Sequence, residues 1–78
     1  DGLGVDVCGN VWATEFRTGS VHLWGPDGGR STVAATLPSA WIPNLAWGPG
    51  SGGAAADSVF VMDRDEGRLF ELLAGVPE

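Results

Sequence analysis

The residues best suited to chemistry in this 78-residue chain are carboxylates and amides that border short apolar runs. Asp1 precedes the run at residues 3–7, Glu15 ends the next run, and Asn44 precedes a later one. A further acidic group lies at residues 63–66. Hard divalent cations such as calcium and magnesium prefer oxygen ligands of this kind. The sequence therefore offers candidate metal ligands at the ends of its apolar runs.

Seven short apolar runs, separated by Gly, Pro, Asn and Asp, predict an all-β chain. The predicted strands are residues 3–7, 11–15, 20–24, 31–37, 44–47, 58–62 and 68–73. Residues 38–43 contain two prolines, which favour an extended connector. Residues 74–78 are too short and too polar to predict another strand.

The chain repeats itself with an offset of 48 residues, which is a period typical of propellers and solenoids. Aligned pairs are Val11 and Val59, Trp12 and Phe60, Gly19 and Gly67, and Val21 and Leu69. Repeated four-stranded antiparallel meanders are the blades of a β-propeller. A β-sandwich also accommodates seven short strands, but its strands need not resemble each other. We therefore expect one blade over residues 1–42 and a second, incomplete blade over residues 43–78.

Strand direction places the candidate ligands at one end of these units. The start of the first strand and the end of the second lie at the same end of an antiparallel pair. That end collects Asp1, residues 15–18, Asn44 and residues 63–66. The opposite end collects residues 8–10, 25–30 and 48–57, so most of the strand-end carboxylates are expected beside Asp1.

Several stretches resemble one known family. The segments DGLGVDVCGNVWATEF, GSVHLWGPDG, IPNLAWG and SVFVMDRDEGRLFEL resemble the senescence marker protein, gluconolactonase and luciferin-regenerating-enzyme-like family. The resemblance implies the last two blades of a six-bladed β-propeller that hydrolyses sugar lactones or related esters with a divalent metal. That metal would be calcium or zinc, with magnesium as a further candidate. Asp1 matches the aspartate that ligates the metal and shuttles a proton, and the family's other ligands, a Glu and an Asn, would lie outside this chain.

Each candidate residue also has a structural interpretation. Asp1 could simply begin a strand, and Asn44 could either bind substrate in an axial pocket or satisfy a turn. Residues 63–67 lack the acidic run and final Glu of an EF-hand and favour a polar hairpin. His22 and Cys8 have no neighbouring partner at a catalytic spacing, so we expect structural roles for both.

The four tryptophans divide by position. Trp12, Trp24 and Trp47 fall within predicted strands, so we expect them to pack between blades. Trp41 lies in the proline-rich connector and is the one expected to be exposed.

Composition excludes several classes of partner. The net charge is −6, with four Arg and no Lys, which argues against nucleic-acid binding through phosphates. One cysteine excludes an internal disulfide, and no apolar run reaches the roughly 18 residues that a membrane helix needs. The family resemblance implies a small lactone as one partner, and either further blades or further copies would be needed to close the ring. Because the chain starts and stops within its own pattern, we expect it to be a fragment; the pattern does not indicate a compartment.

Two further functions are consistent with the same pattern. The chain could belong to a propeller that binds or scaffolds without catalysis, since a fold does not fix a function. It could also be a self-assembling two-blade unit, with three copies making a ring. Ligand-type Glu and Asn residues in neighbouring blades would distinguish the enzyme from the scaffold.

Overall fold

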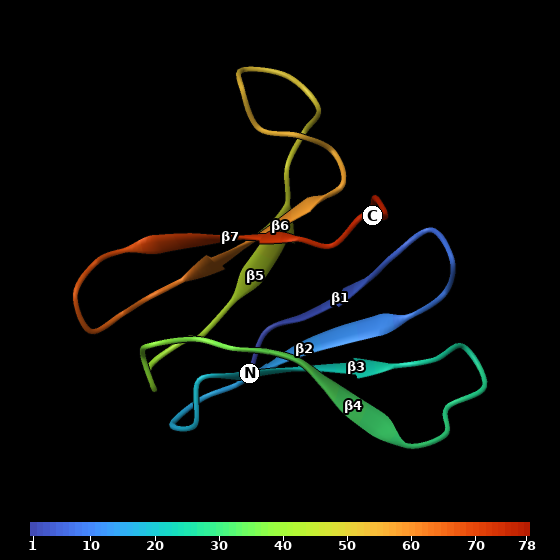
Figure 1. The fold of residues 1–78 in the computed structure, drawn as a ribbon, viewed down its shortest axis with the longest axis horizontal. Coiled ribbons are helices and arrows are strands. Elements are labelled where there is room, and N and C mark those ends of the chain that lie inside the picture. The colour runs from blue at the N-terminus through green and yellow to red at the C-terminus, as the bar shows by residue number, and fades with distance from the viewer.

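The computed structural model describes all of residues 1–78 and contains strands but no helix. The strands are β1 (Leu3–Val5), β2 (Val11–Glu15), β3 (Ser20–Trp24), β4 (Ser31–Thr36), β5 (Leu45–Trp47), β6 (Ser58–Met62) and β7 (Leu69–Leu73). They form two antiparallel sheets, ordered β1-β2-β3-β4 and β5-β6-β7, which we call sheet 1 and sheet 2 (Figure 1). The all-β class and the predicted grouping of four strands and then three are confirmed. None of the chain forms a helix that could cross a membrane.

Strand β1 ends two residues earlier than predicted because Asp6 leaves the strand and organises the following turn. Its buried carboxylate accepts hydrogen bonds from the backbone amides of Cys8 and Asn10, each at 2.9 Å, and from Trp12 Nε1, also at 2.9 Å. Burial acts to raise the pKa of Asp6, but these hydrogen bonds outweigh it and hold the pKa below its ordinary value. The predicted ends of β4, β5 and β7 differ from the observed ones by a single residue.

The internal repeat is visible in the strand registers. Leu3 pairs with Ala13 in sheet 1, and Leu45 pairs with Val61 in sheet 2. By register, the first strands therefore correspond with an offset of 42 residues, whereas β2 and β3 correspond to β6 and β7 with an offset of 48. The six extra residues lie between Trp47 and Val59, where the β5–β6 loop, residues 48–57, projects beyond both sheets (Figure 1).

The core lies between one face of each sheet, which we call the inner faces. Its buried residues are Trp12, Val21, Ile42, Leu45, Trp47, Val59 and Val61. Trp12 of sheet 1 meets Trp47 of sheet 2 edge to face, with ring centroids 6.1 Å apart and planes at 85°. These two tryptophans pack between the sheets as expected, whereas Trp24 lies on the opposite face of sheet 1, with its ring 5.9 Å from that of His22.

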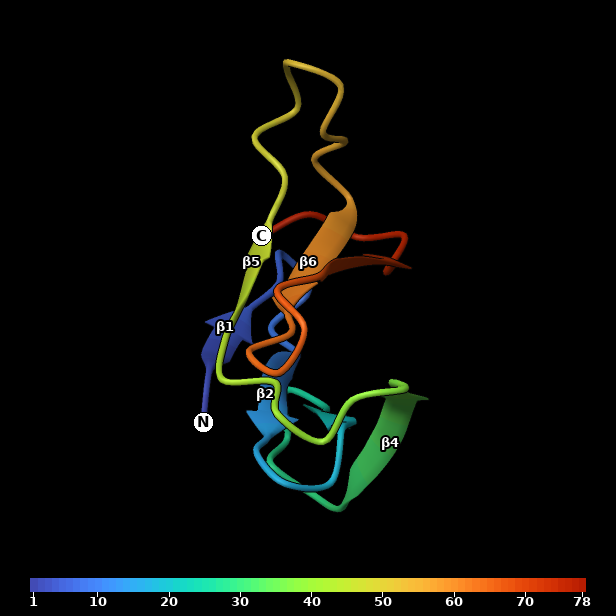
Figure 2. The ribbon, with the colours of Figure 1, turned by 90° about the vertical axis from the view of Figure 1, so that its left-hand side faces the viewer.

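Strands β1 and β5 make the closest approach between the sheets, and two glycines permit it (Figure 2). A Cβ atom on Gly2 would lie 2.6 Å from the Cα of Asn44, and one on Gly4 would overlap the ring of Trp47. Because real Cβ atoms do not approach other atoms so closely, both positions require glycine. The alternation of Gly with larger residues at the start of the chain thus sets the distance between the sheets.

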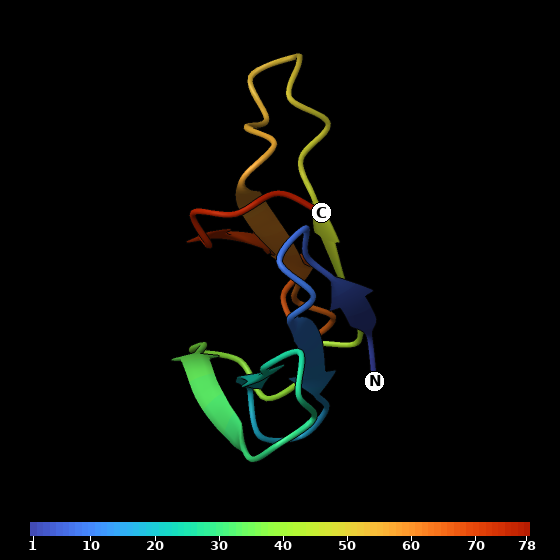
Figure 3. The ribbon, with the colours of Figure 1, turned by 90° about the vertical axis from the view of Figure 1, so that its right-hand side faces the viewer.

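The molecule is thin, with principal extents of 35, 32 and 15 Å (Figure 3). The C-terminal segment crosses back to sheet 1 instead of forming a fourth strand. The Val7 amide donates to the Pro77 carbonyl at 2.8 Å, and Trp47 Nε1 donates to the Val76 carbonyl at 2.9 Å. These contacts hold residues 74–78 against the β1–β2 turn.

We expect Gly2→Ala to lower the free energy of unfolding by about 1–3 kcal/mol, the usual cost of overpacking a close contact. The clash would be with the backbone of Asn44, which cannot rotate away as a side chain could. Urea unfolding followed by tryptophan fluorescence, at one fixed protein concentration, measures the change. Gly29→Ala is the matched control, because a Cβ there meets only the exposed side chain of Asp27. Equal stability of the two variants would contradict a tight β1–β5 contact.

Candidate functional site

Equivalent hydrogen bonds place Asp1 and Asn44 at the same end of the two sheets. The Thr14 amide donates to the Gly2 carbonyl at 2.9 Å, and the Met62 amide donates to the Asn44 carbonyl at 3.2 Å. Both bonds join the start of a first strand to the end of a second strand. The β2–β3 and β6–β7 loops therefore also lie at this end, as strand direction predicts.

Asp1 is exposed and borders a hollow of about 400 Å³ on the outer face of sheet 1, the face opposite the core. Its amino group donates to the Thr14 carbonyl. Within the same hollow, Glu15 Oε1 lies 2.7 Å from His22 Nε2. The hydrogen bond from His22 lowers the pKa of Glu15 below its ordinary value, so this carboxylate is paired within the chain.

Asn44 borders a different hollow, of about 120 Å³, on the outer face of sheet 2. Most of its lining is apolar: Leu45, Ala46, Phe60, Met62 and Leu69. The Asn44 Oδ1 atom accepts a hydrogen bond from the Leu45 amide at 2.9 Å, which satisfies the start of β5. Asn44 is nevertheless exposed, so its amide nitrogen can still reach a ligand.

The residues of this chain do not by themselves form a metal centre. Nowhere do three or more His, Cys, Asp or Glu side chains gather closely enough to hold an ion. Asp1 and Asn44 provide two oxygen-bearing side chains, whereas calcium takes six to eight oxygen ligands. Any metal bound beside Asp1 would need most of its ligands from outside this chain.

The acidic β6–β7 loop is a polar hairpin organised by Asp63. This buried carboxylate accepts hydrogen bonds from Ser39 Oγ at 2.6 Å, from Arg68 Nε at 2.7 Å and from the Asp65 amide at 3.0 Å. The hydrogen bond from Ser39 is the largest cause that lowers the pKa of Asp63, and Arg68 adds to it, so that the pKa falls to about 2. Asp63 thus ties the connector to sheet 2, and its oxygens are already occupied.

An aromatic and arginine cluster at the same end was not anticipated from the sequence. The Phe16 and Trp41 rings are in tilted contact, with centroids 4.9 Å apart and planes at 60°. Arg17 Cζ lies 5.7 Å from the Trp41 ring centroid, and Arg64 Cζ lies 5.9 Å from that of Phe16. Trp41, Arg64 and Asp65 line a hollow of about 300 Å³. Trp41 is therefore half-buried instead of fully exposed, because the connector passes between the two loops.

This cluster has two properties of a ligand-binding surface. Neither Arg17 nor Arg64 forms an ion pair, although the chain carries ten carboxylates. Arg17 also has a φ of 85°, which is unusual for a residue other than glycine and is often found at functional sites. In the sequence, the one indication of this cluster is that Phe16 and Arg64 occupy equivalent positions of the repeat. Trp41 comes to lie between them only through the fold.

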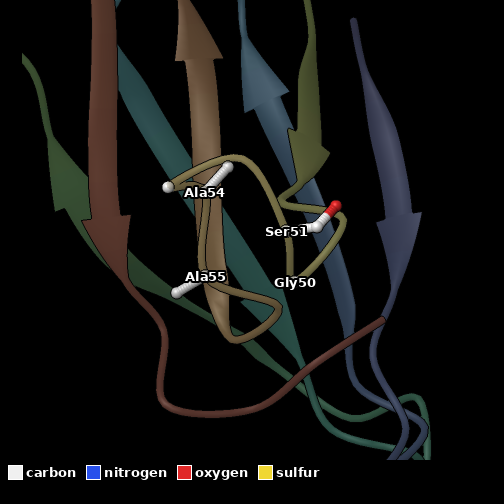
Figure 4. Close-up of a pocket in the computed structure, with 5 residues that line it drawn as sticks. Gly50, Ser51, Ala54 and Ala55 are labelled. Atoms are coloured by element: carbon white, nitrogen blue, oxygen red, sulfur yellow. The ribbon is translucent and has the colours of Figure 1, made fainter.

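The β5–β6 loop contains a further hollow, of about 280 Å³, that has no comparable chemistry (Figure 4). Its lining residues are Gly50, Ser51, Gly53, Ala54 and Ala55, so Ser51 supplies the one side-chain hydroxyl. The loop folds on itself, with the Gly50 amide donating to the Ala54 carbonyl at 2.9 Å. It lies at the opposite end of the sheets from Asp1, as does the exposed Cys8. We therefore place the candidate site at the Asp1 end.

We expect Asp63 to make the protein less stable in acid. Because its pKa is about 2 in the folded chain and ordinarily 3.8, the unfolded chain takes up the proton first as the pH falls. The stabilisation is complete above about pH 4 and is lost as the pH falls through about 2. Urea unfolding across this pH range should show that acid lowers the free energy of unfolding less for Asp63→Asn than for the wild type. The stability of the variant still depends on pH to some extent, because the pKa values of Asp6 and Glu15 are also lowered.

Asp65→Asn is the matched control for this measurement. Asp65 is exposed, and its side chain accepts no hydrogen bond within the chain. The control should therefore keep the acid dependence of the wild type. An identical acid dependence in the wild type and Asp63→Asn would show that Asp63 does not stabilise the hairpin through its charge.

Comparison with known proteins does not assign a function to this chain, so any function must be argued from its geometry. No protein-family model matches the chain, and no curated protein and no solved structure matches it. The resemblance to lactone hydrolases therefore stays a prediction from the residues.

Proposed function

We propose that the two sheets are adjacent blades of a β-propeller and that the chain forms part of a divalent-metal-dependent hydrolase of sugar lactones or related esters. One observation carries this proposal: β1 and β5, the first strands of two successive meanders, lie side by side with Asp1 and Asn44 at the same end. In a propeller the first strands of all blades surround one axis. Residues at their starts would then face a shared central site.

The roles of the residues follow from their chemistry. Asp1 would contribute one carboxylate oxygen to a divalent cation held mainly by other blades, and Asn44 would donate its amide hydrogens to substrate. When bound, such a cation polarises a carbonyl oxygen and makes a bound water more acidic. The Asp1 carboxylate would accept a proton in the hydrolytic step, which is a contribution worth about 10²- to 10⁴-fold in rate.

The second candidate function is a propeller that binds a ligand without catalysis. The contacting rings of Phe16 and Trp41 and the unpaired Arg17 and Arg64 favour it, because they form a surface without requiring a metal. Arginine over an aromatic ring retains its hydrogen-bond donors for a ligand. A protein that binds sugars or sugar acids but shows no metal-dependent turnover would support this function over the first.

The test is lactone hydrolysis with added divalent metal by a completed ring, either a longer protein that contains this chain or an assembly of copies. We expect Asp1→Asn to lower the rate by at least about 10²-fold, because it removes a charged ligand and a proton acceptor while keeping the size of the side chain. The matched control is Asp57→Asn, an exposed aspartate in the loop at the other end of the sheets. An Asp1→Asn variant that keeps more than about a tenth of the activity, above the expected range, would rule out the role of Asp1.

A further inference from the structure

Each sheet has an outer face that nothing covers. The outer face of sheet 1 presents Leu3, Val5, Val11, Ala13, Glu15, His22, Trp24 and Val33, and that of sheet 2 presents Ala46, Phe60, Met62, Leu69, Glu71 and Leu73. Several are large apolar side chains in open solvent: Leu3 is 70% exposed, Leu69 is 65% exposed and Leu73 is 85% exposed. Apolar faces of this kind on a small chain mark sites of association.

The internal repeat indicates what would fit these faces. By register, the outer face of sheet 2 corresponds to the inner face of sheet 1: Phe60 to Trp12, Leu69 to Val21, and Ala46 to Gly4. The outer face of sheet 1 likewise corresponds to the inner face of sheet 2: Leu3 to Leu45, Val5 to Trp47, and Val11 to Val59. The outer face of sheet 2 therefore resembles the inner face of sheet 1, and the outer face of sheet 1 resembles the inner face of sheet 2. The two inner faces already pack together, so two surfaces of this kind fit each other.

The closest point of the internal contact has a counterpart of matched size. Inside the chain the Trp47 ring lies directly over Gly4, where no Cβ atom could fit. At the corresponding outer positions the glycine is replaced by Ala46 and the tryptophan by the smaller Val5. Ala46 is larger than Gly4, and Val5, which it would meet, is smaller than Trp47. The two changes in size compensate, as close packing requires.

The charges of the chain lie mostly away from these faces. Of the ten carboxylates, only Glu15 and Glu71 belong to the strands that form the outer faces, and Asp1 borders the outer face of sheet 1 at its end. Glu71 of sheet 2 is bound by Ser58 Oγ at 2.7 Å, and Glu15 of sheet 1 is bound by His22. The net charge of −6 therefore places little repulsion within a contact between the faces.

We infer that a second copy of this chain docks head to tail, with the outer face of sheet 2 of one copy against the outer face of sheet 1 of the next. Such a contact joins two different surfaces, so it leads either to a closed ring or to an open polymer. Each added copy contributes 8.0 kDa, so the mass of the assembly gives the number of copies in it.

The same contact would complete the candidate site, a consequence that rests on the proposed function. The hollow beside Asn44 lies on the outer face of sheet 2, and the hollow beside Asp1, Glu15 and His22 lies on the outer face of sheet 1. Docking brings Asn44 of one copy beside Asp1 of the next. Each copy then supplies its Asp1 carboxylate and its Asn44 amide to a shared end of the assembly.

The test uses two variants that each block one face. Val5→Arg places a charge on the outer face of sheet 1, and Ala46→Arg does so on that of sheet 2; both positions are exposed. By native mass spectrometry and light scattering, we expect the wild type to form oligomers and each variant alone to be a monomer. An equimolar mixture should form a heterodimer and nothing larger, because each variant retains the face that the other lacks.

Ala56→Arg is the matched control, since it makes the same substitution in the exposed β5–β6 loop and should keep the wild-type mass. If a blocking variant fails to fold by tryptophan fluorescence, Leu3→Glu and Leu73→Glu block the same two faces. A monomeric wild type, a single-face variant that keeps the wild-type mass, or a mixture that stays monomeric would each overturn the inference. Because assembly is measured without substrate, an assembled but inactive ring would refute only the hydrolase.

Discussion

The close approach of β1 and β5 is the contact on which the rest of the structure depends. It is possible only because Gly2 and Gly4 have no side chains, which lets the Asn44 backbone and the Trp47 ring occupy the space. Trp47 then reaches Trp12, and the two rings form the centre of the core. With a chain of this length, little other apolar surface is available to hold two sheets together.

Two buried carboxylates fix the loops at opposite ends of this core. Asp6 orients the β1–β2 turn and holds the indole of Trp12 in place, whereas Asp63 joins the β6–β7 hairpin to the connector through Ser39. Both are fully occupied by hydrogen bonds, and both have a lowered pKa for that reason. The acidic composition of the chain is therefore partly structural, and these two residues are not free to bind a cation.

The candidate site and the uncovered faces are two aspects of one arrangement. Asp1 and Asn44 lie at the same end of the sheets but border hollows on opposite outer faces. Each hollow is open because the sheet beside it has no neighbour. A neighbouring sheet, whether from a longer chain or from another copy, would bury apolar side chains and enclose these polar groups in the same step.

The sequence alone determined the strands, because alternating apolar residues and turn-forming Gly, Pro and Asn act locally. Only the first strand is shorter than predicted by more than a single residue, because the Asp6 carboxylate accepts hydrogen bonds from Asn10 and Trp12. Strand direction also placed Asp1 and Asn44 at one end. Tertiary structure decided which faces met, that Trp41 would lie among side chains of two loops, and that Asp63 would be buried. These outcomes depend on contacts between residues distant in sequence, which no local pattern encodes.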